Sequence, residues 1–362
     1  MKLLHCLSSP HIGGVERLVI ELAIAQNQAG IDVSIMLDTR KGQYYEYLQQ
    51  QNIPIIDSGV KSGFDFNFKT YQDLKQQFEV FDVIHLHDFS PLRSLAAIQS
   101  TTQTVYTIHG LSKGVRKGNK IQSLIRESIK KYCLNKVDVL VANSNYTLSL
   151  AKEHYQLKKT ESVCILNGIK LPEPTEKPIQ LNDEFTIGLV SRFTKRKRID
   201  LLIETFKKYK ESGGEGKLIL VGDGSEFNAI QSEIKKLNLV GFVELVGYTA
   251  NVEEYYRQFD LCVFPFQDEP FGLVAVEAYL NGKAVLAFND SGGLKEVIEP
   301  IEPDNIVSSV DEMVTRLLYW SKNKNLLQSG SENRKVYAIE SFSVERMAND
   351  YLKVYNQTLK AK

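Results

Sequence analysis

The sequence predicts an α/β protein with two doubly wound, Rossmann-like domains and one further helix at its C-terminal end. Three observations predict this fold class. Short apolar runs alternate with amphipathic helical segments along most of the chain, as expected for parallel strands joined by crossover helices. A segment with several prolines interrupts the alternation at residues 169–183, after which it starts again. The length of 362 residues also exceeds the roughly 250 residues at which single hydrophobic cores usually stop growing.

The first domain is predicted to span residues 1–170. A strand at residues 2–8, a helix at 15–28 and a strand at 32–37 make its first βαβ unit. The first apolar run is too short for a signal peptide and leads directly into a glycine pair, so we interpret it as a strand. Further strands are expected at 83–86, 104–108, 139–143 and 162–166.

The second domain is predicted to span residues 171–343. Segment 169–183 has three of the chain's 10 prolines and no helical period, so we expect an extended linker there. A last helix at 344–359, within residues 344–362, follows the completed second domain, and we expect it to pack on the first domain. Strands are expected at 186–191, 217–221, 243–246, 261–265 and 284–288, and helices at 199–210, 226–237 and 252–258.

The composition excludes several classes of protein. A formal net charge of +0 and an isoelectric point near 7.0 exclude a surface that is basic throughout, so we expect no nucleic acid partner. No apolar run reaches the length of about 18 residues that a membrane-spanning helix requires. The cysteines form no C-x-x-C pair and fit the reduced thiols of a cytoplasmic enzyme better than a disulfide framework or a zinc site. They are Cys6, Cys133, Cys164 and Cys262.

The strongest local signal is a pair of glutamates in the segment EPFGLVAVEAYLNGKAV. Glu269 lies in a loop after a predicted strand, and Glu277 lies in the early turns of a helix that begins near Gly272. A carboxylate in this position can bind ribose hydroxyls, while amides at the helix N-terminus face phosphate or sugar hydroxyls. On spacing alone, the alternative that Glu277 belongs to a solvated helix face is equally open.

Cations and glycines surround this pair in the sequence. Arg192 and Lys197 lie between a predicted strand and a helix, where two cations can neutralise a diphosphate. The basic run at residues 195–198 could instead be a nuclear localisation patch, but its place inside a predicted core domain argues against this. The segment 290–293, DSGG, supplies backbone amides that can meet phosphate.

The order of these motifs resembles glycosyltransferase family 4, which has the GT-B fold. The resemblance covers nearly the whole chain and includes the two cations, the two glutamates and the later glycine pair. It implies a retaining, metal-independent hexosyltransferase whose two domains face a central cleft. The first domain would bind the acceptor, and the second would bind the nucleotide-sugar donor.

The resemblance also implies roles for single residues. Arg192 and Lys197 are similar to the family's phosphate-binding pair, Glu269 to the glutamate near the donor sugar, and Glu277 to the glutamate that binds ribose. Glu296 is a weaker candidate. The expected catalytic residues are His109, Glu269, Arg192 and Lys197, and the expected donor-binding residues are Gly13, Gly14, Arg192, Lys197, Tyr248, Glu269, Phe271, Gly272, Leu273 and Glu277.

The glycine pair and the histidine each have an alternative interpretation, and Tyr248 is implicated only through its backbone. Gly13 and Gly14 resemble the glycine pair that lets the donor diphosphate and the acceptor approach the backbone, and an ordinary tight βα turn is the alternative. His109 resembles the histidine beside the transferred sugar, and a core histidine is the alternative. Tyr248 falls where family members contact the nucleobase through backbone atoms.

A metal site is one interpretation of the first domain. His85 and His87 alternate onto the same face of a predicted strand and could bind a metal with Asp88. The resemblance implies no metal there, and the chain has no Asp-x-Asp pair, so we expect neither a metal nor a cofactor.

The chain departs from the family pattern at two places. Arg198 stands where the family has glycine after the phosphate-binding lysine, so this turn must bend without glycine's freedom or use another backbone angle. The glycine-containing segment that normally follows the later glycine pair is replaced by EPIEPDNIVSS at residues 299–309.

A basic amphipathic segment spans Lys113 to Lys136. It has eight basic residues and one acid, Glu127, and such a helix can lie on an anionic bilayer. The chain could therefore be peripheral on the inner face of the plasma membrane; the alternative is a core-packed helix with a solvated basic face. Ile121, Leu124, Ile125, Ile129 and Tyr132 recur at helical spacing, among Lys113, Arg116, Lys117, Lys120, Arg126, Lys130, Lys131 and Lys136.

The resemblance leads to one expected function and two alternatives. We expect transfer of a hexose or N-acetylhexosamine from a nucleotide-diphosphate sugar, with UDP the commonest nucleotide in the family, to a glycan or lipid-linked saccharide in lipopolysaccharide or capsule synthesis. The expected mechanism is front-face displacement, with double displacement through Glu269 as the alternative. The other functions considered are a nucleotide-sugar epimerase of the same fold and a degenerate, non-catalytic nucleotide-sugar binding module.

Overall fold

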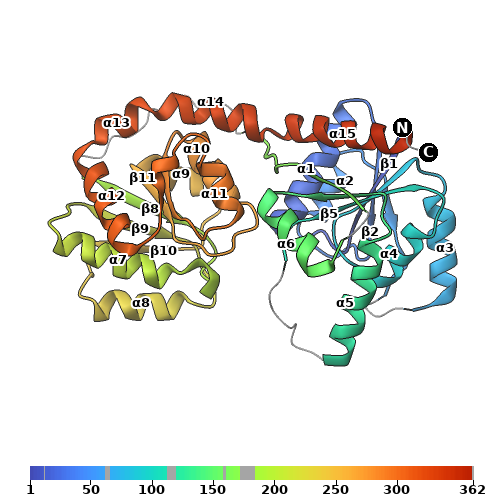
Figure 1. The fold of residues 1–362 in the computed structure, drawn as a ribbon, viewed down its shortest axis with the longest axis horizontal. Coiled ribbons are helices and arrows are strands. Elements are labelled where there is room, and N and C mark those ends of the chain that lie inside the picture. The colour runs from blue at the N-terminus through green and yellow to red at the C-terminus, as the bar shows by residue number, and fades with distance from the viewer. Residues whose placement is uncertain (12, 62–65, 112–119, 158–159, 172–183, 361–362) are drawn as a thin grey trace. The chain divides into compact units, whose positions relative to one another are not determined.

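The computed structural model contains two compact units (Figure 1) and describes residues 1–11, 13–61, 66–111, 120–157, 160–171 and 184–360. Unit 1 comprises Met1–Lys170 and Ser343–Lys362, and unit 2 comprises Leu171–Phe342. Most of the predicted linker, residues 172–183, lies outside the described residues.

Unit 1 is built on a seven-stranded parallel sheet with the strand order β3-β2-β1-β4-β5-β6-β7. The order reverses between β1 and β4, and open α/β sheets bind ligands at the carboxyl ends of the strands beside such a switch point. The strands are β1 Lys2–Leu7, β2 Asp32–Leu37, β3 Ile55–Asp57, β4 Val83–Leu86, β5 Gln103–Ile108, β6 Val139–Ala142 and β7 Glu161–Cys164. The helices are α1 Gly14–Gln28, α2 Tyr45–Gln49, α3 Phe68–Phe78, α4 Pro91–Ile98, α5 Lys120–Leu134 and α6 Asn145–Tyr155, with α15 Val344–Lys360 at the end of the chain.

Both faces of the unit 1 sheet are covered. Successive strand residues point to opposite faces, so Leu3 and Leu4 enter two different apolar clusters, although both are fully buried. The cluster of Leu3 includes α1 and the C-terminal helix α15, whereas the cluster of Leu4 includes α3 and α4. Burial on both faces explains why these strands are continuous apolar runs rather than alternating ones.

The C-terminal helix α15 belongs to unit 1, beside α1 (Figure 1). Its first turn is anchored by Arg346, whose Nη2 donates to the main-chain oxygens of Leu166 and Asn167 at 2.6 Å and 3.2 Å. Further along, the buried Tyr351 and Tyr355 point their hydroxyls at polar groups of the sheet.

Unit 2 is built on a six-stranded parallel sheet with the order β10-β9-β8-β11-β12-β13. Its switch point lies between β8 and β11. The strands are β8 Thr186–Val190, β9 Lys217–Val221, β10 Val243–Gly247, β11 Leu261–Phe264, β12 Ala284–Phe288 and β13 Ile306–Val307. The helices are η1 Lys195–Lys197, α7 Ile199–Glu211, α8 Phe227–Lys236, α9 Val252–Gln258, α10 Leu273–Leu280, α11 Gly293–Ile298, η2 Pro303–Asn305, α12 Val310–Lys322, α13 Lys324–Ser329 and α14 Ser331–Phe342.

The predicted α/β fold with two doubly wound parallel sheets is confirmed. The segment 299–309, which departs from the family pattern, contributes an edge strand and a mostly buried carboxylate to unit 2. Glu302 accepts hydrogen bonds from the Tyr279 hydroxyl and the Val285 amide, both at 3.0 Å, and from Arg334 Nε at 2.7 Å. This segment therefore ties the edge of the sheet to α10 and α14.

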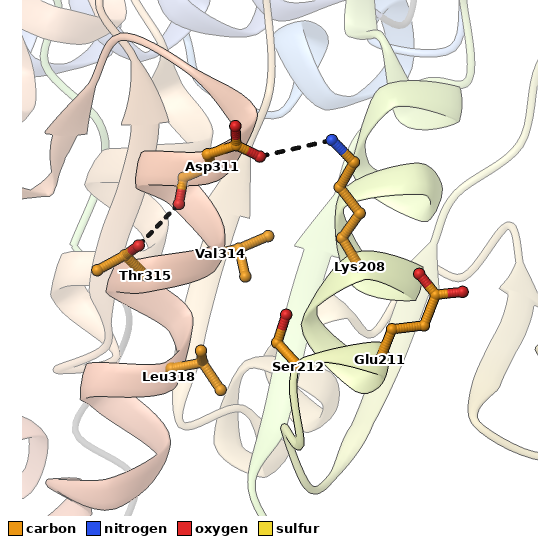
Figure 2. Close-up of a pocket in the computed structure, with 7 residues that line it drawn as sticks. All are labelled: Lys208, Glu211, Ser212, Asp311, Val314, Thr315 and Leu318. Carbon is orange, nitrogen blue, oxygen red and sulfur yellow. Dashed lines mark hydrogen bonds and ion pairs between the residues drawn. The ribbon is translucent and has the colours of Figure 1, made fainter.

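A groove of about 390 Å³ lies between α7 and α12 (Figure 2). It is lined by Lys208 and Asp311, which form an ion pair at 3.5 Å, together with short polar and apolar side chains. None of the residues that line it is a predicted site residue. Arg192 and Lys197 instead follow β8, and Glu269 follows β11.

Candidate active site

Three loops of unit 2 meet at the carboxyl ends of β8, β11 and β12. The loop after β11 runs beside the loop after β12, because the Glu269 amide donates to the Ser291 oxygen at 3.1 Å and the Gly293 amide donates to the Glu269 oxygen at 2.7 Å. The Arg196 guanidinium, from the loop after β8, donates to the Asp268 oxygen at 2.6 Å. These contacts bring together the loops that carry Arg192, Lys197 and Glu269.

Lys197 and Glu269 form an ion pair. Lys197 Nζ lies 2.9 Å from Glu269 Oε2 and 3.6 Å from the centre of the Phe266 ring. Both side chains are mostly covered, with exposed fractions of 18% and 21%. Burial lowers the pKa of Lys197, Glu269 opposes this effect, and the nearby positive charges of Arg196 and Arg192 add to it. The lysine is thus a desolvated cation that one carboxylate holds in place.

Arg198, which stands where the family has glycine, adopts the backbone conformation that glycine favours. Its backbone is left-handed, with φ of 43° and ψ of 44°, a conformation that costs a non-glycine residue about 1–2 kcal/mol. Its guanidinium donates to the main-chain oxygens of Pro265 and Phe266 at 2.6 Å and 3.1 Å, and to both carboxylate oxygens of Asp290. The arginine therefore keeps the backbone angle that glycine would take and joins all three loops.

Glu277 lies on α10, as predicted, and is half-buried. The Tyr256 hydroxyl lies 3.2 Å from Glu277 Oε2 and also 3.2 Å from the Val274 oxygen. Burial raises the pKa of Tyr256 well above its usual value, and the neighbouring Glu277 adds to this rise. A neutral phenol donor therefore orients the carboxylate. Tyr256 was not among the predicted site residues, because the sequence indicated only that it lies on the apolar side of the predicted helix 252–258.

The stretch that leads into α10 presents backbone rather than side chains. Phe271 is buried and packs edge-on against Phe342 at 5.8 Å, so its side chain belongs to the core of unit 2. Gly272 has φ of 99°, and a Cβ there would lie 2.6 Å from Leu294 Cδ1. Leu273 is the first residue of α10 and is half-buried. Only glycine fits the turn that brings the α10 N-terminus to the site.

Two of the remaining predicted residues of unit 2 are exposed. Arg192 follows β8 and is exposed. Tyr248 follows β10 with 76% of its surface exposed. Glu296 is half-buried on the short helix α11.

In unit 1, the predicted residues lie after β1 and β5. Gly13 is the extended N-cap residue of α1, and Gly14 is the first residue of that helix. His109 follows β5, is half-buried, and accepts a hydrogen bond at its main-chain oxygen from Asn143 Nδ2 at 3.2 Å. Burial lowers the pKa of His109 to about 4, with Asp88 opposing this effect, so the imidazole is neutral at pH 7.

His85 of β4 and His87, which directly follows that strand, lie with a third histidine that the sequence did not indicate. His85 and His87 share one face of the sheet with His5 of β1, and ligand atoms of the three rings lie within 4.8 Å of one another. Asp88, expected as their partner in a metal site, instead pairs with Arg93 and accepts from the Ser8 amide at 2.7 Å. The described structure therefore does not support the grouping of the two histidines with Asp88.

The chain matches two family profiles. Residues 12–172 match the profile described as Glycosyltransferase Family 4, and residues 173–336 match the profile described as Glycosyl transferases group 1. The first match falls on the unit that carries the histidines and Gly13. The second falls on the unit that carries Lys197 and both glutamates.

Relatives and solved structures agree with this assignment. An uncharacterized glycosyltransferase of Methanocaldococcus jannaschii is 25% identical over 96% of this chain and 95% of its own. The capsular polysaccharide biosynthesis glycosyltransferase CapM of Staphylococcus aureus is 27% identical over 71% of this chain and 70% of its own. The fold is similar to that of HepE from Anabaena, solved in complex with UDP, with a TM-score of 0.77, 19% identity, and coverage of 99% of this chain and 100% of HepE. The chain belongs to glycosyltransferase family 4 and has the GT-B fold.

Proposed function

We propose that this glycosyltransferase transfers a hexose or N-acetylhexosamine from a nucleoside diphosphate sugar, with retention of configuration and without a metal. The observation that carries the proposal is the Lys197–Glu269 pair at 2.9 Å, beside Arg192 and at the switch point of unit 2. The two cations suit a diphosphate leaving group, because charge-assisted hydrogen bonds stabilise the charge that develops as it departs.

UDP is the nucleotide we propose for the donor. HepE, which shares the fold, was solved in complex with UDP. In this chain, Glu277 carries a carboxylate that Tyr256 orients, and such an acceptor can bind the two hydroxyls of a ribose. The backbone around the exposed Tyr248 would contact the base.

The proposed mechanism is front-face displacement by the acceptor hydroxyl. Glu269 Oε2 already accepts from Lys197 Nζ, which favours a carboxylate that orients the sugar over one that attacks it. The acceptor oxygen would bond to the anomeric carbon as the bond to the nucleotide phosphate breaks. The departing phosphate would take the acceptor's proton on the same face.

The acceptor is proposed to be a glycan or a lipid-linked saccharide in the synthesis of a surface polysaccharide, capsule or lipopolysaccharide. The printed name of the relative CapM, a capsular polysaccharide biosynthesis glycosyltransferase, supports this class. We propose a cytoplasmic enzyme that is peripheral on the inner face of the plasma membrane. Within the described part of the chain, no helix combines the length and apolarity needed to cross a bilayer.

The membrane proposal rests on helix α5. Cys133 and Leu134 at its C-terminal end are buried, as the core-packed alternative expects. Four apolar side chains earlier in the helix are nevertheless exposed, and they share it with basic residues, which suits an anionic bilayer. The exposed fractions are 66% for Ile121, 68% for Leu124, 46% for Ile125 and 49% for Tyr132. Lys113, Arg116 and Lys117 of the predicted basic segment lie outside the described residues.

Vesicle sedimentation tests the membrane proposal. Replacement of Lys120, Lys130 and Lys131 by glutamine should abolish sedimentation with anionic vesicles and leave the protein folded. The matched control replaces Lys207, Lys235 and Lys236 of unit 2 by glutamine and should sediment like the parent protein. Unchanged sedimentation of the α5 variant would contradict the proposal.

Donor turnover tests the proposed chemistry. The protein is incubated with EDTA, a panel of nucleotide sugars and a set of aryl glycoside acceptors, and the products are followed by proton NMR. We expect release of one nucleoside diphosphate and a glycoside with the donor's anomeric configuration. An isomerised donor with no nucleotide release would favour the epimerase, and an intact donor would favour the binding module.

A further inference from the structure

A buried histidine cluster lies at the switch point of unit 1. His5 comes from β1, His85 from β4, and His87 and His109 directly follow β4 and β5. The exposed fractions of His5, His85 and His87 are 0%, 0% and 3%. Buried imidazole rings lower the free energy of unfolding unless their nitrogens are hydrogen-bonded.

Three of these rings form one chain of hydrogen bonds that starts on helix α1. Gln26 is fully buried, and its Oε1 lies 2.7 Å from His5 Nε2. His5 Nδ1 lies 2.8 Å from His87 Nε2, and His87 Nδ1 lies 3.3 Å from His109 Nε2. This hydrogen-bond chain therefore runs from the buried amide of Gln26 to the half-buried His109 at the end of β5.

The protonation of the three imidazoles and the acceptor character of Gln26 Oε1 determine which nitrogen donates in each of these hydrogen bonds. Burial is the main reason that the pKa of His5 and of His109 is lowered to about 4, and it places the pKa of His87 well below its usual value. A neutral imidazole has one N–H donor and one acceptor nitrogen. Because Gln26 Oε1 can only accept, His5 donates through Nε2 and accepts at Nδ1. His87 then donates through Nε2, and His109 donates through Nε2 to His87.

The His85 ring packs against the His87 ring and so helps to position the hydrogen-bond chain. Its ring centre lies 3.8 Å from that of His87. Its own nitrogens are used elsewhere, because Nδ1 lies 2.7 Å from the Tyr355 hydroxyl and Nε2 lies 2.7 Å from Thr107 Oγ1. Tyr351, also on α15, is hydrogen-bonded to the same threonine at 3.0 Å. The C-terminal helix thus fixes the ring against which His87 packs.

We infer that Gln26, His5 and His87 are positioning residues that hold His109 in the Nε2–H tautomer, so that its Nδ1 accepts a hydrogen bond from a hydroxyl of a sugar substrate. The sugar contact rests on the proposed function. The tautomer rests only on the hydrogen-bond chain within unit 1. A metal bound by His5, His85 and His87 is the competing occupant of the cluster, and it would break the His5–His87 hydrogen bond.

Nitrogen-15 NMR of histidine-labelled protein tests the tautomer without any donor. Long-range proton–nitrogen spectra distinguish the two neutral tautomers and the cation, and a His109→Gln spectrum assigns the signals. We expect His109 in the Nε2–H form at pH 7, and the same form in Gln26→Glu, which keeps an acceptor at the start of the chain. An Nδ1–H form of His109 in the parent protein would overturn the inference, whether or not any variant folds. So would histidine signals that change when EDTA is added.

Gln26→Met removes the amide and retains a side chain of similar length. We expect a mixture of His109 tautomers in this variant, with kcat lower by about tenfold or more and an unchanged KM for the nucleotide sugar. The nucleotide part of the donor should bind as before, because Gln26 is predicted to act only through His109. Unchanged kcat would overturn the sugar contact. Absence of turnover in the parent protein would count against the proposed function, while the NMR result would still decide the tautomer.

Discussion

Arg198 holds the Asp290 carboxylate through two hydrogen bonds, of 2.9 Å and 2.7 Å, from a left-handed backbone position. The guanidinium fork matches the two carboxylate oxygens, and such bidentate pairs are among the stronger polar contacts in proteins. The backbone angle, in contrast, favours glycine. The chain therefore combines a local strain with a contact that joins the loops after β8 and β12.

Two substitutions of Arg198 separate the strain from the contacts. Both Arg198→Gly and Arg198→Ala remove the guanidinium and should lower the free energy of unfolding. Because glycine accepts a positive φ without strain, the glycine variant should be more stable than the alanine variant by about 1 kcal/mol. Urea unfolding of the two variants measures the difference. An alanine variant that is as stable as the glycine variant would contradict this account of the backbone.

Gly272→Ala should lower the free energy of unfolding by more than Gly213→Ala, a variant at another positive φ whose added Cβ meets no other atom. At Gly272 a Cβ would meet Leu294 Cδ1 at 2.6 Å, whereas the Cβ of Gly213→Ala, at φ of 84°, has nothing within 4 Å. Both variants incur a backbone cost of about 1 kcal/mol, and only the first adds a clash in a packed interior. Thermal or urea unfolding of the pair should show the larger loss at Gly272. Equal losses would mean that α10 and α11 have room to separate.

Tyr256→Phe should weaken nucleotide binding while the ring stays in the core. The variant removes the hydroxyl that donates to Glu277, and loss of one such hydrogen bond costs about 1 kcal/mol, or roughly fivefold in Kd. Isothermal titration with UDP measures the change. Tyr255→Phe, at the preceding residue of α9, is the matched control and should bind like the parent protein. An unaltered Kd in Tyr256→Phe would show that the Glu277 carboxylate needs no orienting donor.

The buried histidines predict a loss of stability in mild acid. Burial lowers the pKa of His5 and of His109 to about 4, whereas histidines of an unfolded chain titrate near 6.5. Between these values the unfolded state binds more protons, so the free energy of unfolding falls as the pH falls from about 6.5 to about 4 and is retained above 6.5.

Urea unfolding at several pH values measures this dependence. His109→Gln removes one of the titrating rings and should reduce the slope by about 1.4 kcal/mol per pH unit in this window. His154→Gln is the control, because the side chain of His154 is 60% exposed. Identical slopes for the parent protein and His109→Gln would contradict the assignment of a neutral, half-buried His109.

Long buried strands and the order of the site motifs could be predicted from the sequence. The run 83–86 is four apolar or histidine residues that are all buried, and it forms β4 at the predicted bounds. The two-residue strand β13 shows no pattern, since its existence depends on pairing with β12. Arg198 marked an unusual turn in the sequence, but only the structure shows that the arginine itself takes the left-handed angle.

The partners of the site residues could not be predicted, because they are distant in sequence. His5 and His87 are 82 residues apart, and they meet because β1 and β4 are neighbours in the sheet. Lys197 and Glu269 are 72 residues apart and meet in the same way at the ends of β8 and β11. Residue spacing along the chain does not contain such information, whereas strand order does.

Binding of UDP to two lysine variants tests the central claim most directly. In isothermal titration with EDTA present, Lys197→Met should bind UDP roughly tenfold to a hundredfold more weakly than the parent protein, since the mostly buried cation proposed to bind the diphosphate is lost. Lys195→Gln, an exposed lysine in the same turn, should bind like the parent. A Lys197→Met variant with parental affinity, or a parent protein that binds no nucleoside diphosphate at all, would contradict the assignment of the donor site.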